Sequence, residues 1–328
     1  MRIYFDEMKD IFKTVLIKYH FPHGKAERCA TIFASNSLDG VYSHGINRFP
    51  VFIDYVKQGL IHVEAEPELI HQNGLIETWN GHLGPGMYNA SKAMERAITL
   101  SRQNGIGCVS MKNTNHWMRG GTYGWQAADA GCIGICFTNT IANMPPWGGK
   151  EPRLGNNPLI ISVPRQAGHL VLDMAMSQFS YGKLQEYELK NRKLPVAGGF
   201  TNEGQLTDDP SAIVESRRAL PIGSWKGSGL SFMLDVLLTA LTGGQSVGRI
   251  SNGGHETGVS QAFICIYQPS YPADLIEEII DFTKSGLEVD DTRPVLYPGE
   301  NTLATRKDNE RHGIPVDEKI WHSIMELL

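Results

Sequence analysis

A short stretch between residues 41 and 50 places a hydroxyl, an imidazole and a guanidinium close together along the chain, in Ser43, His44 and Arg48. Histidine exchanges a proton near neutral pH, so His44 is a candidate acid or base. The planar guanidinium of Arg48 matches a carboxylate with two hydrogen bonds. Together they suit a 2-oxo acid, with Arg48 holding the carboxylate and His44 protonating the carbonyl oxygen.

The residues around His44 permit this chemistry but also permit a structural role. Gly45 leaves space beside the ring, and a helix that begins after Gly45 would bring Arg48 close to His44. On these residues alone, however, a capping turn at a helix boundary is the commoner role of Ser-His-Gly. The chemical interpretation therefore needs support from the rest of the chain.

Three further clusters are unusually polar for their settings. His116, in the segment 113–117, follows an apolar run and is a second proton-handling candidate or a structural histidine. The segment 138–158 combines asparagines with prolines and glycines, as in a binding loop or a structural turn. Asp173 ends another apolar run, where it could orient His44, bind a ribose or cap the following helix.

Composition limits the class of protein. The chain has 328 residues, enough for one large domain or two, and a net charge of −5 without a basic run, which argues against a nucleic-acid partner. No apolar run is long enough to span a membrane, and the first residues do not resemble a signal peptide. The five cysteines are scattered, and no metal-binding motif is present. We expect a cytoplasmic protein without a metal or a membrane anchor.

The apolar periodicity predicts helices at both ends of the chain and alternating strands and helices between them. An Asn-Gly pair at residues 73–74 predicts a hairpin turn. Helices are expected at 5–19, 25–37, beyond Arg48, and at 86–103, 121–130, 179–190, 227–241, 273–285, 303–312 and 316–328. Strands are expected at 106–111, 133–137, 159–163, 170–174 and 261–267, and a long ordered loop at 195–224.

This pattern predicts an α/β fold in two parts. Residues 1–75 and 272–328 would form a helical domain, and residues 76–271 a layered domain that binds substrate and cofactor. The central domain is not expected to be of the Rossmann type. The pairs at Gly105 and Gly107 and at Gly227 and Gly229 both lack the third glycine of a dinucleotide fingerprint, and there is no P-loop.

Five separated motifs, in the same order, make the chain similar to a known family. They are residues 41–50, 115–121 (Asn-His-Trp-Met-Arg-Gly-Gly), 144–148 (Met-Pro-Pro-Trp-Gly), 179–182 (Phe-Ser-Tyr-Gly) and 225–229 (Trp-Lys-Gly-Ser-Gly). Over nearly its whole length the chain resembles the type-2 malate/L-lactate dehydrogenases. It departs from them at Asn156, where the family has a threonine, so any role of that hydroxyl is not carried over.

The resemblance implies a nicotinamide-dependent reductase of 2-oxo acids, with a non-Rossmann fold and a homodimer whose sites lie near the subunit interface. His44 would be the proton donor, with Ser43, Arg48 and His116 lining the substrate pocket. NADH is the expected cofactor and NADPH the alternative. The cofactor surface implied by the family comprises His169, Leu170, Val171, Leu172, Asp173, Met174, Ala175, Trp225, Lys226, Gly299, Glu300 and Asn301.

The expected reaction is hydride transfer from NADH to the carbonyl carbon of a 2-oxo acid, with 2,3-diketo-L-gulonate, which is reduced to 3-keto-L-gulonate, as the favoured substrate. One alternative is a malate, lactate or ureidoglycolate dehydrogenase on the same scaffold. The other is a protein that binds a nucleotide or sugar acid without turnover. The presence of Ser43, His44 and Arg48 together argues against the second alternative.

Overall fold

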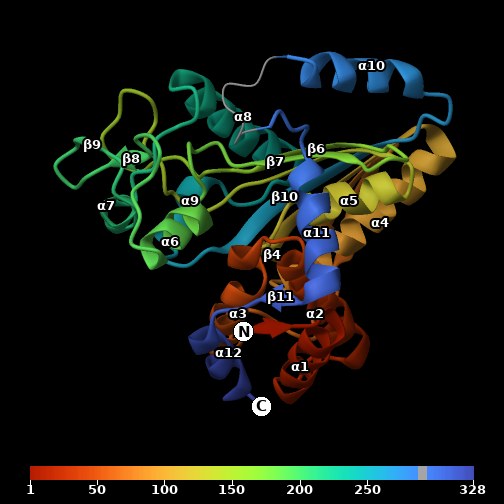
Figure 1. Ribbon diagram of the computed structural model, residues 1–328. Helices are drawn as coiled ribbons and strands as arrows, with labels where there is room; N and C mark the ends of the chain where they lie inside the picture. The colour runs from red at the N-terminus through yellow and green to blue at the C-terminus, as the bar shows by residue number, and fades with distance from the viewer. Residues whose placement is uncertain (287–293) are drawn as a thin grey trace.

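The computed structural model describes residues 1–286 and 294–328, and a seven-stranded sheet runs through its centre (Figure 1). The strand order is β2-β3-β4-β10-β5-β6-β7, and among the pairs in this sheet only β3 and β4 run parallel. The strands are β2 (Glu68–Asn73), β3 (Ile76–Asn80), β4 (Ile106–Asn115), β5 (Ile133–Thr138), β6 (Leu159–Val163), β7 (Leu170–Met174) and β10 (Thr257–Ile266). A doubly wound nucleotide fold needs a mostly parallel sheet, so the predicted non-Rossmann α/β fold is confirmed.

Helices cover both faces of this sheet. On one face lie α4 (Gly86–Asn104) and α5 (Gly121–Asp129), whose small side chains let them approach closely. A Cβ at Gly107 of β4 would lie 2.6 Å from the Ala97 carbonyl oxygen of α4, so a glycine is required there. The other face is covered by α8 (Trp225–Thr242), which buries Leu234 and Leu238 against it.

The two ends of the chain pack together in a separate hydrophobic core, as expected from the sequence. The N-terminal strand β1 (Arg2–Ile3) pairs with β11 (Ile314–Pro315) near the C-terminus, and both termini lie at the same end of the molecule (Figure 1). The helices of this part are α1 (Phe5–Lys18), α2 (His23–Leu38), α3 (Phe49–Lys57) and α12 (Glu318–Met325). Aromatic rings join three of them: Phe12 and Phe49 are stacked with centroids 4.2 Å apart, and Phe33 of α2 makes edge contacts with both.

Two segments that we assigned to the helical part lie with the sheet instead. The hairpin predicted at residues 73–74 is present, and its first strand, β2, is an edge strand of the sheet. The helix α10 (Ala273–Lys284) is attached near β6 and β7, where Arg165 pairs with Glu277 at 2.7 Å. From there α11 (Glu300–His312) runs back to the helical part (Figure 1). The division into two domains stays a prediction, with these boundaries corrected.

The segment expected to be a loop at 195–224 contains short elements of its own. They are β8 (Gly199–Phe200), β9 (Leu206–Thr207) and α7 (Pro210–Ser216). Together with α6 (Tyr181–Leu189) they enclose a small core of Leu184, Leu194, Ile213 and Ala219. We call residues 177–221 the α6–α7 lobe, which lies at one side of the sheet (Figure 1). The remaining helix, α9 (Val247–Asn252), precedes β10.

Candidate active site

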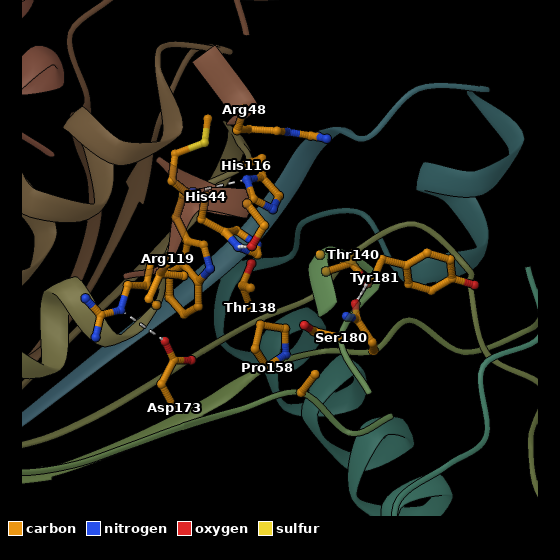
Figure 2. A pocket seen from close by; sticks show the side chains of 18 of the residues that line it. His44, Arg48, His116, Arg119, Thr138, Thr140, Pro158, Asp173, Ser180 and Tyr181 are labelled. Atoms are coloured by element: carbon orange, nitrogen blue, oxygen red, sulfur yellow. Dashed lines mark hydrogen bonds and ion pairs between the residues drawn. The ribbon is translucent and has the colours of Figure 1, made fainter. Parts of the chain in front are cut away.

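A cavity of about 870 Å³ lies where the helical part, the sheet and the α6–α7 lobe meet (Figure 2). This is within the usual size range of ligand-binding sites. It brings together Ser43, His44, Arg48 and His116, the four residues predicted to act on the substrate. Other parts of its wall come from residues 117–120, 140–143, 171–173, 180–182 and 296–299, and from Val41, Tyr55, Thr138, Asn156, Pro158, Ala175, Gln185, Val214, Arg217, Gly254, Glu256 and Thr302.

His44 is held in place by the helix that precedes it. The chain around it forms two 3-10 turns, η1 (Tyr42–His44) and η2 (Ile46–Arg48), and the helix expected beyond Arg48 begins at Phe49. Asn36 of α2 donates a hydrogen bond to the His44 carbonyl oxygen at 2.9 Å. A Cβ at Gly45 would lie 2.3 Å from the Ser37 Oγ. Gly45 therefore permits close packing against α2, and not, as we expected, the approach of a ligand.

The imidazole of His44 is oriented by its neighbour in the sequence. The Ser43 Oγ lies 3.0 Å from His44 Nδ1, which leaves Nε2 for a substrate. Desolvation, followed by the charges of Arg48 and Arg119, lowers the pKa of His44 to about 4. The ring is therefore neutral at neutral pH when no anion is bound nearby.

His116 is the first residue after β4, because that strand continues through the polar residues 113–115 that we expected to form a loop. The Met118 backbone N–H donates to His116 Nδ1 at 3.1 Å, so the neutral ring carries its proton on Nε2. The ring stacks on His44 with centroids 5.6 Å apart. Desolvation, then the charges of Arg48 and His44, lowers the pKa of His116 well below its usual value.

Arg48 lies on the same wall as the two histidines (Figure 2). Within residues 1–286 and 294–328 its guanidinium makes neither an ion pair nor a hydrogen bond. A half-buried guanidinium on a cavity wall, without an ion pair of its own, favours an anionic ligand. Arg48 is thus available to bind a carboxylate.

Asp173 does not orient His44, contrary to one of our expectations. Its Oδ2 accepts a hydrogen bond from the Gly121 backbone N–H at 2.8 Å and lies 3.7 Å from the Arg119 Nε (Figure 2). The His44 nitrogen that it would contact is already occupied by Ser43. Desolvation raises the pKa of Asp173, against the opposing effects of Arg119 and the Gly121 N–H.

Arg119 is a site residue that the sequence analysis did not single out, although it lies in one of the motifs. It pairs with the buried Asp39 at the end of α2, and Asp39 also accepts a hydrogen bond from Arg306 of α11 at 2.6 Å. This network joins the helical part to the wall of the cavity. Glu256 was also missed, because it follows a glycine-rich turn and belongs to no motif that we noticed.

The predicted cofactor residues divide into two groups. Those that line the cavity are Val171, Leu172, Asp173, Ala175 and Gly299. The others do not line it. Leu170, Met174 and Asn301 are neighbours of the first group in the sequence, whereas His169 contacts Asp129 and Glu300 pairs with Lys284. Trp225 and Lys226 are exposed at the start of α8. Within a single chain, the start of α8 is therefore not part of the cavity.

Asn156, which replaces the family threonine, is tied into the neighbouring loop. Its Oδ1 accepts hydrogen bonds from Thr140 Oγ1 and Asn143 Nδ2, both at 3.1 Å. Asn156 lines the cavity and fixes the segment opposite the two histidines.

Two general properties complete the description. In the described part of the chain, no cluster of three or more histidine, cysteine or acidic side chains could hold a metal ion. None of the described helices is both long and apolar enough to cross a membrane.

Comparison with known proteins identifies the family. A family model described as malate/L-lactate dehydrogenase matches residues 3–325. The chain belongs to this family. It is 45% identical, over 333 aligned positions and the full length of both chains, to a Salmonella newport protein named 2,3-diketo-L-gulonate reductase. As a family member it is an oxidoreductase that acts on a 2-hydroxy or 2-oxo acid with a nicotinamide cofactor, which confirms the enzyme class that we predicted.

Solved structures of family members have the same fold. One is a sulfolactate dehydrogenase from Methanocaldococcus jannaschii, with a TM-score of 0.89 and 29% identity over 100% of this chain and 96% of that one. Another is a malate dehydrogenase from Pyrococcus horikoshii, with a TM-score of 0.90 and 26% identity over 100% of this chain and 94% of that one. The different substrates in these names show that the fold alone does not determine the substrate.

Proposed function

We propose that this protein uses NADH to reduce 2,3-diketo-L-gulonate at the carbonyl next to its carboxylate, with His44 as the proton donor. The observation that carries the proposal is that Arg48, which makes no ion pair within 4 Å in the described chain, lies with His44 in one cavity. The choice of substrate is supported by the name of the relative that is 45% identical over its full length.

In this proposal each side chain has a distinct task. Arg48 binds the carboxylate of the substrate through two hydrogen bonds. Ser43 orients the His44 ring through Nδ1, so that Nε2 can give its proton to the carbonyl oxygen. When bound, the nicotinamide supplies the hydride to the carbonyl carbon. The neutral His116 can donate a hydrogen bond from Nε2 to an oxygen of the substrate.

The wall around Gly299 fits a dinucleotide. Gly299 has a φ of 99°, which favours glycine, and a Cβ there would lie 3.1 Å from both the His169 carbonyl oxygen and the Val171 nitrogen. It precedes α11, whose first backbone N–H groups have no side-chain cap. The Glu300 N–H donates to the Tyr297 carbonyl oxygen, so the N–H groups that remain for a phosphate are those of the next residues of the first turn. We propose that this wall, including Val171 and Leu172, holds the cofactor.

We also propose a homodimer formed through α8. The exposed side of this helix is apolar and carries Trp225, Leu230, Phe232, Met233, Val236 and Leu237. An exposed apolar patch of this kind is typical of a subunit interface. Because Lys226 lies on the same side and not in the cavity of its own chain, it can serve the cofactor only if the dimer brings it to the partner's cavity.

The proposed location is the cytoplasm. All five cysteines are free, and four of them are buried. A protein without disulfides fits a reducing compartment.

The test is the loss of NADH absorbance with a panel of 2-oxo acids. We expect the highest kcat/KM for 2,3-diketo-L-gulonate and lower values for oxaloacetate, pyruvate and oxalurate, the 2-oxo acid related to ureidoglycolate. The same panel with NADPH determines the cofactor preference. A preference for one of the other acids would assign the corresponding alternative substrate. No turnover of any acid with either cofactor would support a binding protein instead.

A further inference from the structure

Glu256 places a carboxylate in the cavity that the proposed reaction does not use. Its side chain is 16% exposed and stands immediately before β10. The Oε1 atom is buried and has no hydrogen-bond partner in residues 1–286 and 294–328. The Nε2 of His116 lies 3.9 Å from this Oε1 atom. Such an oxygen is costly to bury, so it favours a ligand that can donate a hydrogen bond to it.

A second unpaired acceptor lies close to the first. The Asn115 Oδ1 is also buried without a hydrogen-bond partner in the described chain. Asn115 and Glu256 line a small recess of about 20 Å³ with Arg48, Tyr55 and His116, and the apolar side chains of Val51, Phe52, Ile61 and Met118 complete its wall. Arg48, Tyr55, His116 and Glu256 line the main cavity as well, so the recess adjoins it. Its volume is sufficient for one group of the size of a water molecule or a hydroxyl.

The chemistry of the recess distinguishes between possible substituents of a substrate. A hydroxyl can donate to Glu256 and accept from the Nε2–H of His116. A methyl group would leave the buried acceptors unpaired. A second carboxylate would approach the like charge of Glu256, which is unfavourable in an enclosed site.

We infer that Glu256 makes this recess a specificity subsite, which accepts a hydroxyl of the substrate chain and disfavours a second acidic group. The inference rests on the proposed function, and it narrows the substrate class to hydroxylated 2-oxo acids with a single carboxylate. Burial raises the pKa of Glu256, whereas Arg48 and the Ile141 backbone N–H oppose that rise. The net effect is a raised pKa, and the charge of Arg48 limits the rise. A second carboxylate, which can only accept hydrogen bonds, would also leave the buried oxygen of Glu256 unpaired.

The experiment compares Glu256→Gln with wild type on three acids, with NADH. They are 2,3-diketo-L-gulonate, which carries hydroxyls, oxaloacetate, which carries a second carboxylate, and pyruvate, which has neither. We expect kcat/KM to fall about tenfold or more for diketogulonate and to rise about tenfold for oxaloacetate, as for one hydrogen bond to a charged group. The kcat/KM for pyruvate should change by less than about threefold, because its methyl group neither donates a hydrogen bond nor carries a charge. The matched control is Glu7→Gln on α1, which removes an exposed carboxylate far from the cavity in sequence and should retain the wild-type ratios.

Glu256→Asp provides a second variant that keeps the charge. It should weaken the reduction of diketogulonate while still disfavouring oxaloacetate, and it serves alone if Glu256→Gln fails to fold. An unchanged diketogulonate-to-oxaloacetate ratio in active Glu256→Gln, or efficient use of oxaloacetate by Glu256→Asp, would overturn the subsite alone. Absence of turnover of all three acids by wild type would overturn the proposed function, and the subsite with it.

Discussion

His44 and Arg48 are coupled through their charges. In the absence of an anion, desolvation and, after it, the charges of Arg48 and Arg119 lower the pKa of His44 to about 4, so the ring has lost the proton that the proposed reaction requires. A carboxylate bound to Arg48 offsets this repulsion and raises the pKa of His44. Substrate binding should therefore favour the protonated form of His44, which is the form that donates the proton.

The coupling predicts a specific pH dependence. Because kcat/KM reports the free enzyme, its value for reduction should fall about tenfold per pH unit above the His44 pKa of about 4. Because kcat reports the complex, it should stay level to a higher pH. The measurement is a pH profile of both constants.

His44→Asn is the control for this profile, and it should lower turnover by about 10²–10⁴-fold and abolish the slope. A slope that persists in this variant would show that another group supplies the proton.

The planar guanidinium of Arg48 should matter as much as its charge. Arg48→Lys keeps the charge but loses the paired hydrogen bonds, so about 1.5–3 kcal/mol of transition-state binding should be lost. Steady-state kinetics with the acid and with its amide or ester provides the test. If wild type does not discriminate between the acid and these derivatives, Arg48 does not bind the carboxylate.

The site residues could be predicted from sequence only where they share a short stretch or a recognisable motif. Ser43, His44 and Arg48 are local, and His116 lies in a motif. Glu256 gave no signal, because its environment is created by the folding of β10 against Asn115. An unpaired buried oxygen is a property of tertiary structure and leaves no pattern in the chain.

The first turn of helix α6 packs tightly against Ser43, the residue that orients His44. A Cβ at Gly182 would lie 2.4 Å from the Ser43 Oγ and 2.5 Å from its Cβ. Gly182→Ala should therefore push Ser43 and α6 apart and lower kcat by about 10²-fold, the scale expected for a misplacement of about 1 Å. Kinetics and thermal unfolding should be measured together, since a lower kcat with unchanged unfolding identifies misplacement.

Gly24→Ala is the matched control for this substitution. Gly24 lies in a helix as well, but nothing lies within 4 Å of an added Cβ, so the activity should be unaffected. Equal activities of the two variants would mean that the wall near Ser43 adapts freely.

Elements were predictable where an apolar run has clear ends. The strands at 159–163 and 170–174 have the bounds expected from sequence. By contrast, β4 is longer than expected, because its polar end pairs with β10 across two irregularities in register. The two-residue strands of the α6–α7 lobe are too short for any periodicity to reveal.

For the whole molecule, the main prediction concerns assembly. Met233→Glu combined with Leu237→Glu places two charges on the exposed side of α8 and should convert a dimer into monomers, as measured by sedimentation. Leu275→Glu on α10 is the control, because it places one charge on another exposed apolar residue. A wild type that is already monomeric would contradict the proposed interface.

Lys226→Ala tests whether the same interface serves the cofactor. If Lys226 reaches the partner's cavity, this variant and the monomeric variant should both bind NADH more weakly, in fluorescence titrations at two salt concentrations. Unchanged NADH affinity in Lys226→Ala would remove this residue from the site.

The pairing of β1 with β11 also sets the order in which the protein can be made. The turn that carries His44 is held by α2, and α2 belongs to a core that includes Ile314, Val316, Trp321 and Ile324. A ribosome synthesises these residues after α2 and after the whole sheet, so the first helices must wait for them before their core can close. The sheet and its helices contain their own buried core and can form earlier. The part that carries His44 is thus translated early but can complete its core only after residues 314–324 have emerged, so a nascent chain should show no activity before that point.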